Sequence, residues 1–292
     1  MFDLSEFRLP SPIQQLSLNE LKDTNVNLFI KRDDLIHPII SGNKWRKLEH
    51  TLLDAQQQNK THLVSFGGAY SNHLLALACA ASRFGFETVG FVRGENVDNP
   101  MLFLCQQFGM NLVFTNRTDY KDKQKLFHEY TQNRPNTYFI DEGGAGILGK
   151  KGCQGILKEI EQQQNESKFD HLFLPTATQT TLNGLLQHQQ KHPSNIEIVG
   201  INVLKYSDKQ QQICSNTNLI HTYHFGGYAK TPTHLLQFAQ NIATQTGIIF
   251  DPIYTAKCLY AVVDMAQKNH FRPNANILML HTGGLFGVFG NQ

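Results

Sequence analysis

Short apolar runs alternate with helical patterns through most of this chain of 292 residues. The runs typical of strands cover residues 28–31, 63–66, 88–92, 112–114, 172–174, 196–203 and 277–280. Apolar residues with helical spacing cover 72–84 and 99–108. Strands that alternate with helices favour βαβ units and parallel sheets, and therefore an α/β fold. In such sheets, ligand sites lie at the carboxyl ends of the strands.

Glycines gather in pairs, most of them just past these apolar runs, at Gly67-Gly68, Gly143-Gly144, Gly226-Gly227 and Gly283-Gly284. Glycine permits positive φ angles and a close approach of the backbone to another group. For a single pair, ordinary turn chemistry is the simpler explanation. Four pairs in one chain favour backbone walls around a small anionic or planar ligand.

The composition of the chain excludes several classes of protein. Lys and Arg number 26 against 24 Asp and Glu, so the net charge of +2 lacks the basic surplus of a nucleic-acid-binding protein. No long uncharged apolar run indicates a transmembrane span, and residues 1–10, with Asp3 and Glu6, are not typical of a secretory signal. Five scattered cysteines fit a reducing compartment: Cys79, Cys105, Cys153, Cys214 and Cys258. We therefore expect a cytoplasmic protein of about two domains, without a nucleic-acid or membrane partner.

The most informative segment is FIKRDDLIHPIISGNKWRKLEH, residues 29–50. It predicts a short strand, a turn at Pro38, and a helix capped by Ser41 or Asn43. Lys44 then lies in the first turn, where the positive end of the helix dipole lowers the proton affinity of its amine. A neutral lysine amine is what Schiff-base chemistry needs. From the spacing alone, a solvated lysine is the simpler interpretation.

A second segment, SFGGAYSNHLLALACA, predicts a strand that leads through two glycines into a helix start. Backbone N–H groups and short polar side chains at a helix N-terminus suit a carboxylate, which indicates Ser71, Asn72 and His73. Ser71 is also a candidate proton carrier. A plain Ser or Asn cap explains the same residues.

Three weaker segments lie at other strand ends and helix starts. Thr176, Thr178, Thr180 and Thr181 offer hydroxyls beside backbone N–H groups, which suits a phosphate, although the loop lacks the ending of a Walker motif. In DPIYTAK, Tyr254 is placed to stack on a planar ring, and MLHTGGLFG follows the last strand. Half-buried side chains with structural partners explain each segment equally well.

Taken together, the segments resemble the pyridoxal-phosphate (PLP) enzymes of the 1-aminocyclopropane-1-carboxylate (ACC) deaminase and D-cysteine desulfhydrase family. The resemblance runs in order from about residue 9 to the C-terminus, through KRDDL…SGNKWRKLE, FGGAYSNH, DEGGAG…LG, DPIYTAK and HTGG. It implies the tryptophan-synthase-β-like fold, PLP fold type II, with two open twisted parallel-sheet α/β domains and the cofactor in the cleft between them. It also implies pyridoxal 5′-phosphate as the cofactor, a small amino acid as the substrate and a homodimer, and we expect no metal ion.

The resemblance implies roles for single residues as well. Lys44 would hold the cofactor through an imine, Tyr254 would lie against its ring, and Thr282 would face the pyridine nitrogen. The catalytic residues would be Lys44, Ser71 and Tyr254. The substrate would contact Ser71, Asn72, His73, Gly144 and Tyr254, and Asn72 would also hydrogen-bond the 3′-oxygen of the cofactor. The cofactor phosphate would be held by Ala177, Thr178, Gln179, Thr180 and Thr181.

Two positions help to choose within the family. ACC deaminases look like Tyr-Glu where this chain has Tyr254-Thr255, and like Ser-Asn-Gln where it has Ser71-Asn72-His73. A carboxylate keeps the pyridine nitrogen protonated and makes the ring a stronger electron sink, whereas a neutral hydroxyl does not. Opening a cyclopropane should need the stronger sink, so Thr255 favours the desulfhydrase branch, and His73 also resembles that branch.

One departure from the family concerns the phosphate loop. Relatives are rich in glycine there, whereas this chain reads TATQTT and retains only Gly184 farther along. Side chains at Gln179 and Thr180 either crowd the phosphate or replace the lost backbone contacts with their own polar groups. The departure bears on the affinity for the cofactor and not on its identity.

The sequence therefore predicts a PLP-dependent lyase or deaminase, first of all a D-cysteine desulfhydrase-like enzyme that forms pyruvate, ammonia and sulfide. The alternatives are an ACC deaminase, and a protein that binds PLP or an amino acid with little turnover. We expect a large cofactor-binding domain of residues 1–48 and 156–292, and a small inserted α/β domain of residues 49–155. Arg93, Arg117 and Lys150 receive no role and are expected to be solvated.

Overall fold

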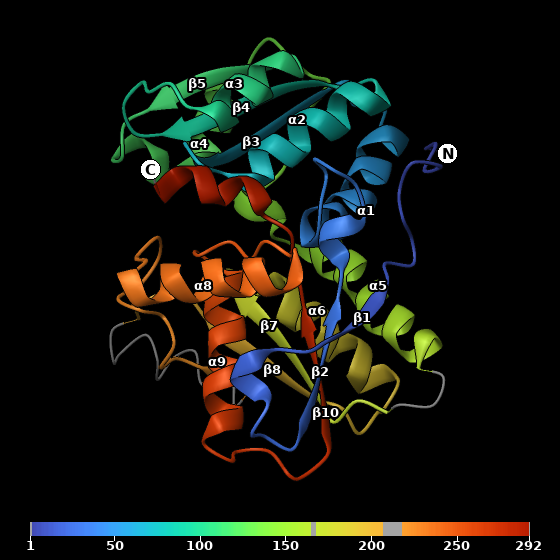
Figure 1. Ribbon diagram of the computed structural model, residues 1–292. Helices are drawn as coiled ribbons and strands as arrows, with labels where there is room; N and C mark the ends of the chain where they lie inside the picture. The colour runs from blue at the N-terminus through green and yellow to red at the C-terminus, as the bar shows by residue number, and fades with distance from the viewer. Residues whose placement is uncertain (1, 165–167, 207–217, 292) are drawn as a thin grey trace.

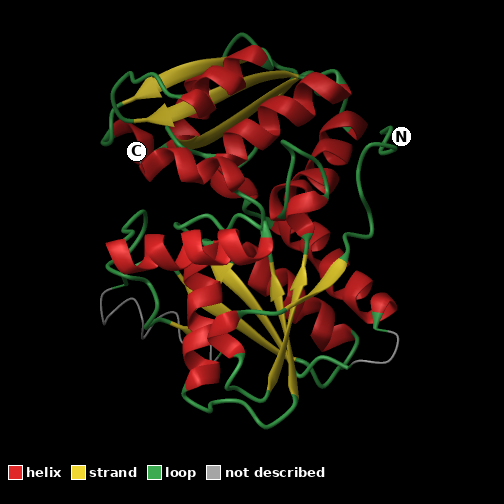
Figure 2. Cartoon of the chain, viewed as in Figure 1, coloured by secondary structure: helices red, strands yellow, loops and turns green. Residues whose placement is uncertain are grey.

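The computed structural model describes residues 2–164, 168–206 and 218–291 and contains two sheets, drawn in yellow in Figure 2. The larger sheet has the order β1-β2-β10-β7-β8-β9, in which β1 is antiparallel to β2 and every other pair is parallel. Its strands are β1 (Ile13–Leu16), β2 (Val26–Lys31), β7 (His171–Thr176), β8 (Glu197–Asn202), β9 (Leu219–Ile220) and β10 (Ala275–Leu280). Residues from both ends of the chain thus share one sheet.

The smaller sheet is parallel throughout, with the order β5-β4-β3-β6. Its strands are β3 (His62–Gly68), β4 (Glu87–Arg93), β5 (Met110–Thr115) and β6 (Thr137–Phe139). The predicted α/β class with parallel sheets is therefore confirmed, while the predicted domain boundaries remain a prediction.

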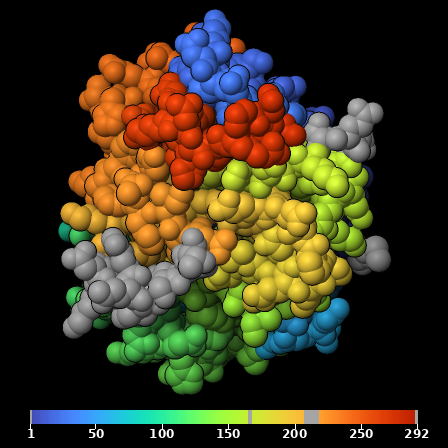
Figure 3. All heavy atoms as spheres, turned by 90° about the horizontal axis from the view of Figure 1, so that it is seen from below, coloured from blue at the N-terminus to red at the C-terminus, as the bar shows by residue number. Residues whose placement is uncertain are grey.

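Helices cover both sheets, and the two sheets form separate layers in Figure 1. The α-helices are α1 (Asn43–Gln57), α2 (Asn72–Phe84), α3 (Pro100–Gln107), α4 (Lys123–Thr131), α5 (Ile147–Gln163), α6 (Thr180–Lys191), α8 (Thr233–Thr246) and α9 (Thr255–Gln267). Short 3-10 helices are η1 (Asn19–Leu21), η2 (Asp33–Leu35), η3 (Asp119–Lys121), η4 (Glu142–Gly144) and η5 (Leu285–Asn291). Seen from below in Figure 3, the N-terminal segment in blue lies beside a C-terminal segment in red.

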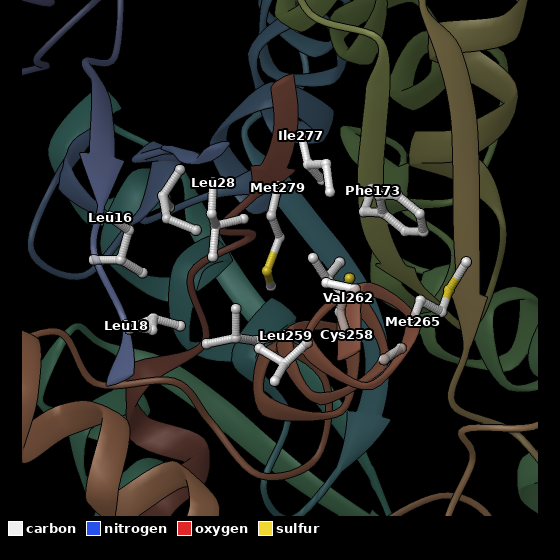
Figure 4. Packing of buried hydrophobic residues seen from close by; sticks show 14 of the residues in the cluster. Leu16, Leu18, Leu28, Phe173, Cys258, Leu259, Val262, Met265, Ile277 and Met279 are labelled. Atoms are coloured by element: carbon white, nitrogen blue, oxygen red, sulfur yellow. The ribbon is translucent and has the colours of Figure 1, made fainter. Parts of the chain in front are cut away.

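Alternation along the central strands explains why the larger sheet is buried on both faces. In β10, Ile277 and Met279 face the core under α8 and α9, whereas Leu278 and Leu280 face the core under α5 and α6. Figure 4 shows the first of these cores, where Ile277 and Met279 lie close to Val262 of α9. A continuous apolar run therefore indicates a central parallel strand, as the sequence predicts for residues 277–280.

Two further expectations concern the whole chain. No helix in the described part of the chain has the length and apolar character that a membrane crossing needs. Cys79, Cys105, Cys153 and Cys258 are buried free thiols, and Cys214 lies outside the described residues.

Candidate active site

A cavity of about 910 Å³ lies where the carboxyl ends of strands from both sheets face each other. Its lining includes most of the predicted site residues: Lys44, Ser71, Asn72, His73, Ala177, Thr178, Gln179, Thr180, Thr181, Tyr254 and Thr282. Gly144 is the exception, because it lies behind the wall while Gly143 lines it. A second hollow of about 690 Å³, beside α6, contains none of the predicted residues.

Helix α1 begins against the end of β10. Its N-cap is Gly42, with φ 65°, so the prediction that Ser41 or Asn43 caps the helix is wrong. A Cβ at residue 42 would lie 2.0 Å from the carbonyl oxygen of Thr282, so only glycine allows this approach. Lys44 lies in the first turn, as predicted, and its Nζ donates to Asn43 Oδ1 at 2.8 Å.

The amine of Lys44 has a pKa close to neutrality. Burial, followed by the positive charge of Lys47, lowers the pKa of Lys44 to about 7. A lowered pKa is what the sequence predicts, but burial is its main cause in the structure. A substantial fraction of this amine is therefore unprotonated at neutral pH.

Other charged residues near Lys44 form ion pairs that stabilise the fold and do not line the cavity. Lys31 Nζ lies 2.9 Å from Glu159 Oε2, and Arg46 Nη2 lies 2.9 Å from Asp33 Oδ1. Arg46 also pairs with Glu159, and none of these four side chains lines the cavity. The network joins β2, η2, α1 and α5, and it holds the helix that carries Lys44.

The start of α2 has the features of a carboxylate site. Ser71 is the N-cap, and its Oγ accepts a hydrogen bond from the N–H of Leu74 at 3.2 Å. Helix geometry leaves the N–H groups of Asn72 and His73 without an intrahelical partner. Both residues line the cavity, so these donors are available to an anion there.

His73 is a buried, neutral hydrogen-bonding group. Its Nε2 lies 2.8 Å from Ser65 Oγ, whose own proton goes to the carbonyl of Ile140 at 2.8 Å. Nε2 therefore carries the ring proton, and Nδ1 is a buried acceptor without a partner in the described residues. Burial and the charges of Lys44 and Lys47 lower the pKa of His73 to about 3, which keeps the ring neutral.

The loop between β7 and α6 presents hydroxyls to the same cavity. Thr176 Oγ1 is buried and has no hydrogen-bond partner in the described chain, and Thr178 Oγ1 lies 3.2 Å from Thr180 Oγ1. The N-cap of α6 is Gln179, which has φ 57° and makes no side-chain cap. An unpaired hydroxyl beside the free N–H groups of a helix start fits the phosphate of PLP.

Gly184, the one glycine that the sequence retains here, serves another purpose. A Cβ there would lie 2.6 Å from the carbonyl oxygen of Lys150 and 2.7 Å from the Cβ of Cys153, both in α5. Gly184 therefore allows close contact between α5 and α6. It is not part of the phosphate loop.

Tyr254 and Thr255 begin α9, where Asp251 fixes their backbone. The buried carboxylate of Asp251 accepts from Tyr254 N–H at 2.8 Å and from Thr255 Oγ1 at 2.8 Å. Thr255 is fully buried and does not line the cavity, whereas Thr282 does. Thr282 is therefore the neutral hydroxyl that the C-terminal strand offers to a ligand.

Two tyrosines meet on this wall, and the sequence indicated only one of them. The rings of Tyr254 and Tyr228 lie edge to face with centroids 6.0 Å apart, and burial is the main cause that raises the pKa of each. Both phenols stay protonated at neutral pH, so Tyr254 is suited to donate a hydrogen bond. Tyr228 directly follows Gly226-Gly227, and that glycine pair is the sequence signal that could have pointed to it.

Lys47 is another cavity residue that sequence reasoning missed, although the spacing Lys44-x-x-Lys47 places both lysines on one helix face. Its Nζ donates to the carbonyl of Gly143 at 3.2 Å, and burial lowers its pKa. Arg93 and Arg117 are exposed, as predicted, but both line the cavity. The expectation that they are merely solvated was therefore incomplete.

A lysine amine with a pKa near neutrality, in one cavity with a helix start that suits a phosphate, is the arrangement expected of enzymes that hold a carbonyl cofactor. The chain belongs to the pyridoxal-phosphate dependent enzyme family, whose match covers residues 4–283. PLP is therefore its cofactor.

Individual relatives are similar over nearly the whole chain. A putative ACC deaminase of Thermotoga maritima is 32% identical, over 97% of this chain and 96% of its own length. A D-cysteine desulfhydrase of Klebsiella pneumoniae is 26% identical, over 96% of this chain and 93% of its own length. The crystal structure of an ACC deaminase homologue superposes with a TM-score of 0.87 at 29% identity, covering 99% of this chain and 93% of that one.

Proposed function

We propose that the enzyme is a lyase of the D-cysteine desulfhydrase type, which converts cysteine and water into pyruvate, ammonia and hydrogen sulfide. The observation that carries this choice is the neutral hydroxyl of Thr282 on the cavity wall. Thr255 does not line the cavity, and its hydroxyl donates to Asp251 instead. A neutral partner leaves the pyridine nitrogen unprotonated, which suits β-elimination better than the opening of a cyclopropane.

We propose that the cofactor binds through residues of α1, of the segment that follows β10, and of the end of β7 and the loop into α6. Lys44 would hold it covalently, and Thr282 would face its ring nitrogen. The phosphate would take the unpaired hydroxyl of Thr176 and the N–H groups at the start of α6, with Thr178 and Thr180 beside them. The cation of Lys47, close to Gly143 on the same wall, would balance part of the phosphate charge.

The residues of the chain then position the substrate and move its proton. The N–H groups of Asn72 and His73 and the hydroxyl of Ser71 would bind the substrate carboxylate. The amine of Lys44, with a pKa of about 7, would accept the Cα proton, while the protonated Tyr254 would donate a hydrogen bond. When bound, PLP supplies the aldehyde that takes the substrate amine and a ring that accepts the electron pair left at Cα.

Two other functions have support. The name of the Thermotoga maritima relative favours ACC deamination, a hydrolase-type reaction of ACC and water that gives 2-oxobutyrate and ammonia. The left-handed backbone at Gln179 favours weak cofactor binding with little turnover. A homodimer and a cytoplasmic location remain predictions from the family resemblance and the composition.

The test uses the purified protein loaded with PLP. Wild type should be yellow, and Lys44→Ala should lose the visible absorbance and at least about three orders of magnitude in turnover. After borohydride treatment, peptide mass spectrometry should locate the pyridoxyl group on Lys44, and Lys60→Ala, a surface variant, should behave as wild type. Pyruvate and sulfide from D- or L-cysteine support the desulfhydrase, and 2-oxobutyrate from ACC supports the deaminase. A pyridoxyl group on Lys44 without product from any of these supports the binding protein.

A further inference from the structure

Three cations lie on the wall that the smaller sheet contributes to the cavity. Arg93 ends β4, Arg117 follows the end of β5, and Lys121 ends η3, and all three line the cavity. None has a carboxylate oxygen within 4.0 Å in the ranges that the structure describes. Glu142, an acidic residue on the same wall, already pairs with Lys123 at 2.9 Å. The wall therefore carries unpaired positive charge.

The sheet register gives the order of these cations relative to the start of α2. Gly68 of β3 pairs with Arg93 of β4, and Arg93 pairs with Thr115 of β5. Adjacent strands lie about 4.8 Å apart, so Arg93 stands one strand, and Arg117 about two strands, from the loop that leads into α2. This spacing is comparable to the length of an amino-acid side chain.

Arg93 has two neighbours on the cavity wall, Gly68 and Tyr120. Its Nη2 lies 3.8 Å from the position that a Cβ on Gly68 would take, and its guanidinium carbon lies 5.6 Å from the ring centroid of the buried Tyr120. The positive charge of Arg93 also acts across the cleft to lower the pKa of Tyr228, although burial raises that pKa more. The guanidinium is thus positioned without an ion-pair partner of its own in the described chain.

We propose that, besides cysteine, the enzyme accepts amino acids whose side chain ends in a second anionic group, a carboxylate, sulfonate or phosphate, bound by Arg93 and Arg117. The inference rests on the proposed function in placing the α-carboxylate at the start of α2. An arginine fork matches the oxygens of such groups, and its hydrogen bonds to an anion are stronger than those to a neutral group. The side chain would extend along the strand ends from the α-carboxylate toward the two arginines.

O-phosphoserine is one substrate of this class, and its β-elimination can use the same catalytic residues. In O-phosphoserine, the Cα–H bond breaks and its proton passes to Lys44, while the Cβ–O bond breaks and phosphate departs with the electron pair. Hydrolysis of the remaining fragment consumes one water, so O-phosphoserine and water give pyruvate, ammonia and phosphate, without any oxidant.

The test compares charged and neutral substrates on the PLP-loaded enzyme. Pyruvate formation is measured with both enantiomers of O-phosphoserine and of β-chloroalanine. The side chain of β-chloroalanine carries a leaving group but no charge. Arg93→Gln and Arg117→Gln should lower kcat/KM for O-phosphoserine roughly 10- to 100-fold, mainly through KM, and change it less than about threefold for β-chloroalanine. The matched control Arg134→Gln, on the same layer but away from the cavity, should leave both substrates unchanged.

A binding measurement separates this inference from the proposed reaction. By calorimetry, the wild-type holoenzyme should bind aspartate more tightly than asparagine, and Arg93→Gln should remove the difference. If that holds but no amino acid yields pyruvate, the anion site stands and the lyase assignment falls. If the variants weaken charged and neutral compounds equally, or weaken neither, the anion site is overturned while the lyase reaction stands wherever pyruvate forms.

Discussion

The starts of α2 and α6 occupy the same position in their respective sheets, yet they are built differently. Each follows the carboxyl end of a parallel strand and lines the same cavity. The α2 start has the glycine pair Gly67-Gly68 and a side-chain cap from Ser71. The α6 start has no glycine, no side-chain cap, and Gln179 at φ 57°.

The α2 start therefore has a hydrogen-bonded cap of its own, whereas the α6 start leaves polar groups for a ligand to bind. At α2, Ser71 already occupies one of the free N–H groups, and Gly67 leaves room for its side chain. At α6, the hydroxyl of Thr176 is buried without a partner in the described chain. A buried polar group without a partner costs free energy until something binds it, so the α6 start gains most from the cofactor phosphate.

The largest effect should come from filling the space behind the Ser71 cap. A Cβ at Gly67 would lie 2.6 Å from the Cβ of Ser71, so Gly67→Ala should lower the free energy of unfolding by about 3 kcal/mol. Gly68→Ala is the matched control, because its nearest contact is Arg93 Nη2 at 3.8 Å. Urea unfolding of the cofactor-free protein measures both, and equal losses would contradict the account of the α2 start.

Removing one hydroxyl from each start should have opposite effects on stability. Ser71→Ala removes a cap and should destabilise the cofactor-free protein by about 1 kcal/mol. Thr176→Val removes an unpaired buried hydroxyl and should stabilise it by about 1 kcal/mol, while weakening PLP binding about tenfold. Urea unfolding and PLP titration test the pair, and a destabilised Thr176→Val protein would mean that this hydroxyl has a partner.

A pH effect of intermediate size should arise from Lys44, which lies between the two starts. Its native pKa of about 7 is below the ordinary value of 10.5, so from pH 7 upward the unfolded chain binds more protons than the native one. The free energy of unfolding should therefore rise with pH across this window. Because the side chain is partly open to the cavity, we expect a rise on the order of 1 kcal/mol between pH 7 and 9.

The difference between wild type and Lys44→Met isolates this effect, since Lys47 and Lys257 also have lowered pKa values and contribute in the same direction. Both cofactor-free proteins are unfolded in urea at pH 7 and pH 9. Identical slopes in the two proteins would show that Lys44 has an ordinary pKa.

The smallest effect should come from relaxing the backbone at the α6 start. Gln179→Gly removes the cost of a left-handed conformation and should stabilise the protein by about 0.5 kcal/mol after the entropy cost of glycine. Thr178→Gly, in the same loop without a positive φ, should destabilise it instead. A thermal shift in the same direction for both variants would contradict this.

Local signals account for what the sequence predicted well. Helix α2 begins and ends where predicted, because Ser71 caps its start and Gly85 adopts the left-handed conformation at its end. Central strands such as β10 were found because they are continuous apolar runs. The lysine was predicted because it lies in the first turn of a helix within a family motif, and the α2 start and the threonine loop were predicted because each follows a strand end.

What the sequence did not predict depends on contacts between distant segments. Gly42 replaces a side-chain cap at α1 because Thr282, near the other end of the chain, approaches it closely. Tyr228 reaches the cavity wall on a turn that a residue of α9 holds in place. That residue is Lys257, whose Nζ donates to the carbonyls of His224 and Gly227 at 2.9 and 2.8 Å. No local pattern records either contact.

The ion network of Lys31, Asp33, Arg46 and Glu159 changes how the most recognisable stretch of this chain should be interpreted. Basic and acidic residues lie close together there, yet Lys31, Asp33 and Arg46 anchor α1, and only Lys44 and Lys47 of its cations line the cavity. A mutational scan of the stretch should therefore yield two phenotypes, folding defects at the anchors and folded but inactive enzyme at Lys44. A sequence motif that is typical of a family can thus contain residues that stabilise the fold as well as residues that take part in the chemistry.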